Sequence, residues 1–133
     1  MAHPISVIAV VDDDNRVLES LESLLESNGY TVRLFAAAHE LLSSKELDHV
    51  DCLITDIGMP DVSGLELLAL VRESHSEVPV ILITGRPTTE VEQYYLEKGA
   101  HAFFQKPFDG RVLLQALQKA LQVTSSRSSA IQS

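Results

Sequence analysis

Apolar runs of strand length alternate along this chain with segments whose apolar residues recur at helical spacing. The runs at 5–11 and 78–84 are continuous and rich in β-branched residues, which is typical of parallel strands buried on both faces of a sheet. Shorter apolar runs lie between and after them. The predicted strands are therefore 5–11, 30–35, 50–55, 78–84 and 100–105.

A predicted helix follows each of these strands. The first begins after Asp14, which suits an N-cap, and Asn28-Gly29 ends it. The others cover 39–47, 64–74, 89–98 and the residues from Asp109 to Leu121. The segment at 39–47 lacks a good N-cap, and the segment at 89–98 has a thin apolar face. Five alternations of strand and helix with short connections predict an α/β fold with a doubly wound, five-stranded parallel sheet.

The chain of 133 residues has the length of a single domain, and we assign residues 1–122 to it. Residues 123–133, VTSSRSSAIQS, are rich in serine and show no periodicity. We predict that they form a flexible tail or the start of a linker.

Composition excludes several classes of function. The formal net charge of −9 argues against a nucleic-acid-binding surface in this segment. Cys52 is the only cysteine, so an intramolecular disulfide and the cysteine spacing of a zinc site are both excluded. We expect Cys52 to be a small, buried apolar residue of a strand. Neither a bilayer-spanning apolar run nor a basic-then-apolar leader is present, and we expect a cytoplasmic protein. Surface positions without a shared metal site are expected for His3, His39, His49, His75 and His101.

Chemically useful side chains stand where predicted strands end. Asp12 and Asp13 follow the first strand, Asp56 the third, Thr84 ends the fourth and Lys106 follows the fifth. Each has an ordinary explanation by itself, such as a turn, a helix cap or a solvated lysine. Because parallel strands point their carboxyl ends the same way, all should gather on one rim, where open α/β sheets place their ligands.

The residue types have complementary chemistry. Neighbouring carboxylates raise one another's pKa unless a cation is present, and hard oxygen ligands with room for water suit Mg²⁺. A lysine and a hydroxyl on the other side suit the oxygens of a phosphoryl group. That leaves one carboxylate as a nucleophile, as in aspartyl-phosphate chemistry. Asp56 is the candidate, because it stands alone at the end of its strand.

These residues lie in motifs that resemble the receiver domain of bacterial two-component response regulators, with wording closest to the FixJ-like subgroup. The motifs are VVDDD at 10–14, TDIGMPDVSG at 55–64, LITG at 82–85 and FFQKPF at 103–108. The resemblance extends over residues 6–121 and implies a CheY-like (flavodoxin-like) sheet with the strand order 2-1-3-4-5.

The resemblance also implies residue roles. Asp56 would accept a phosphoryl group from a phosphohistidine of a sensor histidine kinase. Mg²⁺ would bind Asp56, Asp13 directly, Asp12 through water, and the backbone carbonyl of Gly58. Lys106 would pair with the phosphoryl group, and the peptide bond after it is often cis in such domains.

Signal output is implied in the same way. Thr84 would move to hydrogen-bond the phosphoryl group, and Phe103 would swing into the space it leaves. The surface altered would comprise the helix at 89–98, the strand at 100–105 and the last helix, and the same face could form a homodimer. An output domain outside this segment, perhaps binding DNA, would then control transcription.

The sequence departs from the common pattern of the family at two places. Gly58 is often a larger residue in the family, and Arg86-Pro87 is unusual after the threonine, so Arg86 either screens the phosphoryl group or is simply solvated.

Three alternative functions fit the sequence less well. A haloacid-dehalogenase enzyme would need an aspartate at Gly58, and a nucleotide binder would need a glycine-rich turn after the first strand. An inert receiver would usually lack acidic or lysine members of the set. We therefore expect a phosphoacceptor signalling domain, not an enzyme, that helps to catalyse its own phosphorylation and dephosphorylation and turns over no metabolite.

Overall fold

The computed structural model describes residues 6–85 and 92–132, with side chains described as far as Gln122. Five strands form one parallel sheet: β1 (Val7–Val11), β2 (Thr31–Phe35), β3 (Cys52–Asp56), β4 (Val80–Thr84) and β5 (Ala102–Gln105). The helices are α1 (Asn15–Glu26), α2 (Ala38–Ser44), the 3₁₀ helix η1 (Glu46–His49), α3 (Gly64–Ser74), α4 (Glu92–Glu97) and α5 (Gly110–Gln132).

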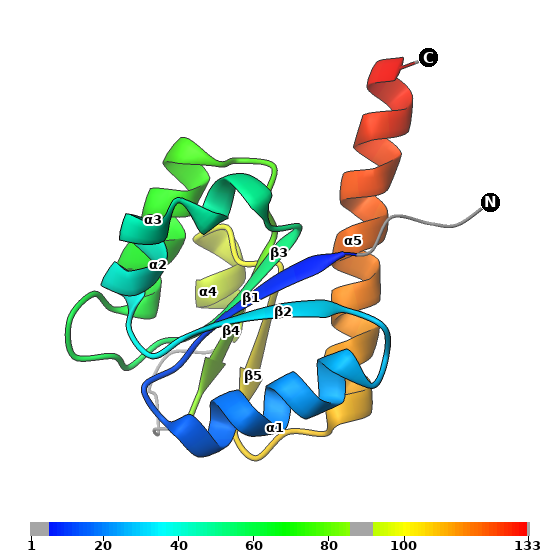
Figure 1. Cartoon of the computed structure of the whole chain (residues 1–133). Helices are drawn as coiled ribbons and strands as arrows, with labels where there is room; N and C mark the ends of the chain where they lie inside the picture. The colour runs from blue at the N-terminus through cyan, green and yellow to red at the C-terminus, as the bar shows by residue number, and fades with distance from the viewer. Residues whose placement is uncertain (1–5, 86–91, 133) are drawn as a thin grey trace.

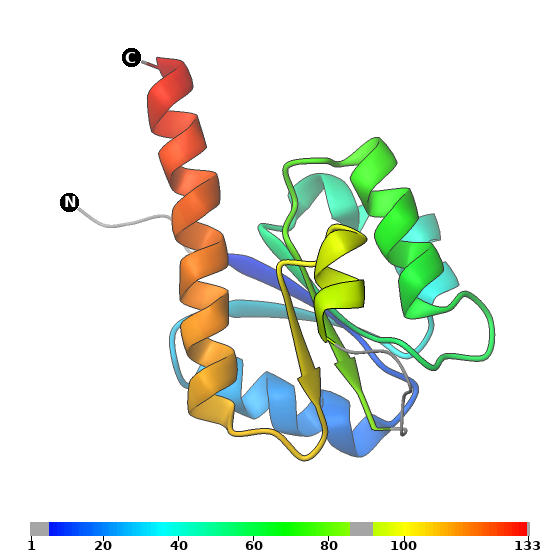
Figure 2. The same cartoon turned by 180° about the vertical axis from the view of Figure 1, so that it is seen from behind.

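The strand order is β2-β1-β3-β4-β5, which confirms the predicted order. The chain therefore starts in the middle of the sheet, moves to one edge and then returns to build the other side. Helices α1 and α5 cover one face, and α2, α3 and α4 cover the other (Figures 1 and 2). The connection reverses direction beside β1 and β3, so a crevice is expected at their carboxyl ends.

The core consists of two apolar layers, one on each face of the sheet. Ala9 and Val11 of β1 pack into the layer beneath α2, α3 and α4, whereas Ile8 and Val10 pack into the layer beneath α1 and α5. All four are inaccessible to solvent. A strand that is covered on both faces has no polar side, which explains the continuous apolar runs in the sequence.

Side chains cap three of the helices, and one of these caps is the one predicted at Asp14. The Asp14 carboxylate accepts a hydrogen bond from the Arg16 amide at 2.9 Å, and the Asp109 carboxylate does the same for Arg111. The Ser63 hydroxyl accepts from the Glu66 amide at 3.1 Å. Such caps satisfy amides that have no partner inside the helix.

The single helix predicted over 39–47 is wrong. It is interrupted at Lys45, which takes a left-handed conformation with φ of 64°, and a 3₁₀ turn follows. The Ser44 hydroxyl accepts a hydrogen bond from the Glu46 amide at 3.1 Å, which replaces a helical bond, and the turn buries Leu47.

Helix α5 also differs from expectation. Its backbone continues past Gln122 to Gln132, where the sequence predicted a flexible tail or linker, and its last turns extend beyond the sheet (Figure 1). No glycine or proline occurs in 123–132 to stop the helix. The start of the fourth predicted helix, at 89–91, lies outside the described residues. In the described part of the chain, no helix is long and apolar enough to cross a membrane.

Candidate functional site

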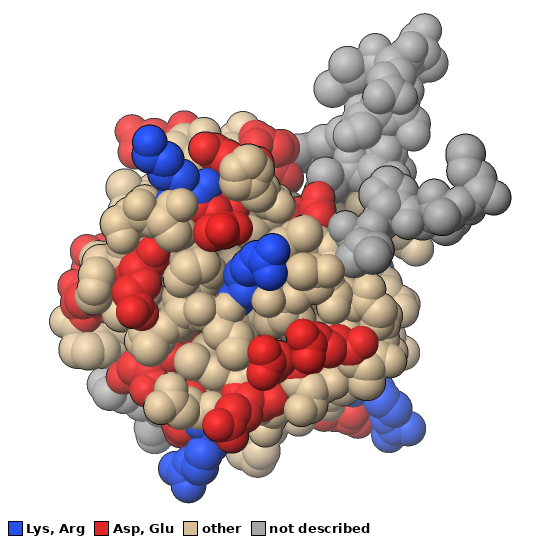
Figure 3. All heavy atoms as spheres, viewed as in Figure 1, with Lys and Arg blue, Asp and Glu red and all other residues tan. Residues whose placement is uncertain are grey.

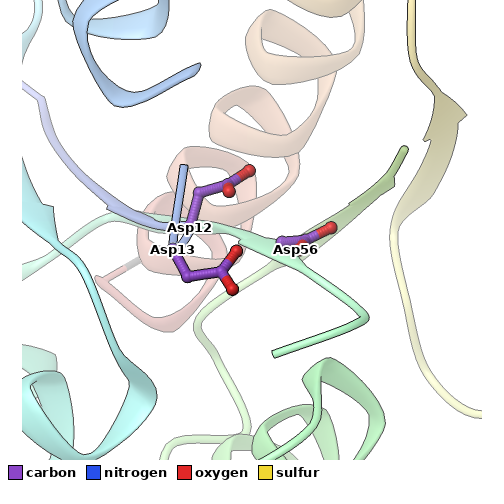
Figure 4. Close-up of side chains that lie close together, drawn as sticks. All are labelled: Asp12, Asp13 and Asp56. Atoms are coloured by element: carbon purple, nitrogen blue, oxygen red, sulfur yellow. The ribbon is translucent and has the colours of Figure 1, made fainter. Parts of the chain in front are cut away.

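The register of the two central strands places Asp12 beside Asp56. Val11 of β1 pairs with Thr55 of β3, so the next residue of each strand is an aspartate at the same edge of the sheet. Figure 4 shows the side chains of Asp12, Asp13 and Asp56 lying close together at this edge. One oxygen from each lies within 4.8 Å of one from each of the others. The predicted acidic cluster is confirmed in its placement.

The three carboxylates differ in exposure. Asp12 is fully buried and Asp56 is 7% exposed, whereas Asp13 is exposed. Asp12 is fixed by the amide of Asp14, which donates to its Oδ1 at 2.9 Å. The cluster therefore has a rigid buried side and an open side, and the open side leaves room for water and for an incoming group.

Lys106 reaches this cluster from the loop after β5. Its Nζ donates to Asp12 Oδ2 at 2.8 Å and lies 3.8 Å from Asp56 Oδ1. Its amide donates to the Thr84 carbonyl at 2.7 Å, and the peptide bond to Pro107 is cis, as expected. The lysine is thus held between the buried aspartate and the candidate nucleophile.

Thr84 ends β4 at the same edge of the sheet and is 4% exposed. Phe103 lies on β5 opposite Leu82, on the face covered by α4, and its ring stacks on that of Tyr95 with centroids 4.6 Å apart. The positions of both residues match expectation. Their proposed movements remain predictions.

Burial raises the pKa of Asp56 above the usual value of 3.8, and repulsion from Asp12 adds to this. The charge of Lys106 acts in the opposite direction but does not outweigh them. Ionised Asp56 is consequently under electrostatic stress, which a cation or the loss of the charge would relieve.

This stress predicts a pH-dependent effect of Asp56→Asn on stability. Because the native state holds the Asp56 proton more tightly than the unfolded chain does, stability is lost as pH rises through the native pKa. In metal-free buffer at neutral pH, Asp56→Asn should therefore raise the free energy of unfolding. The gain should shrink as the pH falls towards 3.8. Urea unfolding at neutral pH and at a pH near 3.8 measures this gain in the free energy of unfolding. An Asp56→Asn variant that is less stable than the wild type at neutral pH would contradict the raised pKa of Asp56.

The residues present fit a divalent cation of the Mg²⁺ type. The cluster offers hard carboxylate oxygens, one member is exposed, and Mg²⁺ usually retains several waters while using one or two carboxylates. Gly58 lies half-buried in the loop after β3. Its carbonyl as a further ligand remains a prediction.

Gly64 supports the site in a way that the sequence did not reveal. A Cβ atom at this position would lie 2.5 Å from the carbonyl oxygen of Asp56 and 2.7 Å from Cα of Ile57. The Gly64 amide also donates to the Ile57 carbonyl at 2.9 Å. The N-terminus of α3 therefore packs directly on the backbone that carries Asp56.

The other sequence expectations concern residues away from the cluster. Cys52 is fully buried, and burial raises the pKa of its thiol to about 12, so it acts as an apolar strand residue. His39 pairs with Asp61 at 2.8 Å, and His75 pairs with Asp48 at 2.7 Å, both at the surface. Arg86, whose role was left open, lies outside the described residues.

Comparison with known proteins gives the family. Residues 8–118 match the family described as response regulator receiver domain. The chain is 36% identical over 129 residues to the response regulator protein TodT of Pseudomonas putida, covering 97% of this chain and 57% of TodT. It is 33% identical to the transcriptional regulatory protein FixJ of Rhizobium meliloti, covering 85% of this chain and 55% of FixJ. It thus spans little more than half the length of these relatives.

A solved structure agrees with these relatives. The CheY-like receiver domain protein from Methanospirillum hungatei superposes with a TM-score of 0.83 at 30% identity, covering 93% of this chain and 99% of that one. With the family matched over most of its length, the chain belongs to the response regulator receiver domains of two-component systems and is similar to those of the FixJ type.

Proposed function

We propose that this domain accepts a phosphoryl group on Asp56 from a phosphohistidine of a sensor histidine kinase and that Mg²⁺ is required. The observation that carries the proposal is the cluster of Asp12, Asp13 and Asp56 with Lys106 against it. Family membership supports the same reaction. The domain helps to catalyse its own phosphorylation and turns over no metabolite.

The chain's own groups fit the transfer step. A carboxylate oxygen of Asp56 attacks phosphorus, the bond between phosphorus and the donor nitrogen breaks, and that nitrogen keeps the electron pair. Lys106 Nζ, 3.8 Å from Asp56 Oδ1, is placed to pair with a phosphoryl oxygen. Mg²⁺ held by Asp12, Asp13 and Asp56 would offset the negative charge that collects there. Thr84 is the candidate for a hydroxyl contact from β4.

A groove beside the site suits a protein donor. Lys106 is part of both the cluster and the groove, so a partner seated there would be next to Asp56. Apolar side chains dominate its lining, which consists of Arg16, Val17, Ser20, Leu21, Leu24, Lys106, Pro107, Phe108 and Gly110. This arrangement supports a sensor kinase as the partner.

The output is proposed to pass through the surface of α4, β5 and α5 to a further domain that regulates transcription. The relatives TodT and FixJ are longer than this chain, and the name of FixJ describes a transcriptional regulatory protein. Direct DNA binding by this segment is not proposed, because its net charge is −9 and acidic side chains gather over α1 in Figure 3. The α4-β5-α5 surface is also the proposed homodimer face.

The experiment is intact mass after incubation with acetyl phosphate, with Mg²⁺ or with a chelator. We expect one phosphoryl adduct that requires Mg²⁺. Asp13→Asn should reduce the Mg²⁺ affinity and the rate of adduct formation by about 10- to 100-fold, since even groups that only orient metal ligands have effects of this size. Its stability should change little because Asp13 is exposed.

Asp14→Asn is the matched control. Asp14 is the neighbouring aspartate, but its carboxylate caps α1, and asparagine is an equally good cap. It should form the adduct at the wild-type rate. Equal losses in both variants, or an adduct that forms as fast with the chelator, would contradict the proposed metal site.

A further inference from the structure

In the described part of helix α4, the side chain buried in the core is an aromatic ring. Among its described residues, Glu92–Glu97, only Tyr95 is buried, with 3% of its surface exposed. Tyr94 and Leu96 are half-buried. Figure 2 shows this short helix lying over the strands at the β5 side of the sheet. The packing of α4 therefore depends strongly on what surrounds the Tyr95 ring.

The ring of Tyr95 lies on Phe103. The two rings are 4.6 Å apart between centroids and only 8° from parallel. Phe103 pairs with Leu82 in the sheet and faces the same apolar layer as Tyr95. The neighbouring Tyr94 meets Tyr95 edge-on, with an angle of 88° between the rings. The aromatic residue that is expected to move upon phosphorylation is thus the one on which α4 is anchored.

We propose that Tyr95 is the positioning residue that couples α4 to phosphorylation, a proposal that rests on the function proposed above. When Phe103 turns towards the end of β4, it leaves the face of Tyr95, and the buried anchor of α4 loses its stacked partner. A weaker anchor lets α4 shift or open locally. The coupling depends on the contact between the Tyr95 and Phe103 rings and not merely on the small apolar face of α4.

The amides of Lys98 and Ala100 report on α4 because both donate to the carbonyl of Tyr95, at 3.1 and 3.2 Å. Their hydrogen exchange is measured by NMR with and without acetyl phosphate and Mg²⁺, while intact mass records the adduct. In the wild type, phosphorylation should speed their exchange about two- to tenfold, the range that corresponds to a lost aromatic pair. Tyr95→Phe, which keeps the ring, should respond in the same way.

Tyr95→Leu keeps an apolar anchor without the ring. It should form the adduct normally, exchange fast at these amides before phosphorylation and show no further change after it. Tyr94→Leu is the matched control, because the neighbouring ring does not stack on Phe103, and its response should match the wild type. A Tyr95→Leu variant that keeps the wild-type response overturns the proposal.

A double-mutant cycle tests the pair in unphosphorylated protein. Tyr95→Leu and Phe103→Leu should each speed exchange of the Lys98 and Ala100 amides, and the double variant should be no faster than the faster single variant. The coupling is overturned if the effects of the two substitutions on these exchange rates are additive. It is also overturned if the wild type forms the adduct without any change in exchange of the Lys98 and Ala100 amides. A wild type that forms no adduct at all instead refutes the phosphoacceptor function, and the coupling to phosphorylation falls with it.

Discussion

Asp56→Asn is expected to lose the Mg²⁺-dependent phosphoryl adduct completely. The side-chain amide is not a nucleophile towards phosphorus, and the remaining aspartates of the cluster are poorly placed to replace it. Asp12 is fully buried and bonded to Lys106 at 2.8 Å, and Asp13 lies on the open side of the cluster, where it is proposed to hold Mg²⁺. Intact mass after treatment with acetyl phosphate measures the result.

Asp61→Asn serves as the matched control for this loss. Asp61 lies in the same loop after β3, but its carboxylate pairs with His39 and accepts from the His39 amide at 3.0 Å. The pairing holds the pKa of Asp61 well below its usual range. The control should be phosphorylated like the wild type. Persistence of a stoichiometric adduct in Asp56→Asn would show that another residue accepts the group.

Gly64→Ala should produce the largest loss of stability among the variants considered. Its Cβ would lie 2.5 Å from the Asp56 carbonyl oxygen, and both of the closest atoms belong to the backbone, so no flexible side chain can yield. Overpacking of this kind costs about 1–3 kcal/mol of unfolding free energy. Because the displaced backbone carries Asp56, the rate of phosphorylation should fall as well. Urea unfolding and the mass assay measure the two effects.

Gly29→Ala separates the loss of stability from the displacement of the site. Gly29 has a φ of 90°, which strains an alanine, but apart from the residue itself and its two chain neighbours no atom lies within 4 Å of the added Cβ. The variant should lose about 1–2 kcal/mol of stability and keep wild-type phosphorylation. If Gly64→Ala is phosphorylated as fast as Gly29→Ala, the packing of α3 on Asp56 does not position the carboxylate.

The sequence predicted the placement of the cluster because that placement follows from topology. Once strands are identified and parallel, their ends must meet, so Asp12, Asp56, Thr84 and Lys106 could be assigned to one edge without any knowledge of side-chain contacts. The continuous apolar runs identified the central strands for a similar reason, since both faces of the sheet are covered.

The features that the sequence did not predict depend on particular atoms in contact. The left-handed Lys45 follows from a local hydrogen bond of Ser44 and from the burial of Leu47, neither of which has a strong sequence signal. The extension of α5 was missed because a serine-rich segment without periodicity resembles a linker. The Gly64 contact with the Asp56 carbonyl appears only when the backbones have been placed in space.

Locating the phosphoryl group is the most direct test of the central claim. The wild-type protein is treated with acetyl phosphate and Mg²⁺, the acyl phosphate is reduced with borohydride to homoserine, and the product is mapped by peptide mass spectrometry. Homoserine at position 56, with Asp12 and Asp13 unmodified, is the predicted result. Homoserine at position 12 or 13, or a phosphoryl group on a residue other than aspartate, would contradict the assignment of Asp56 as the phosphoacceptor.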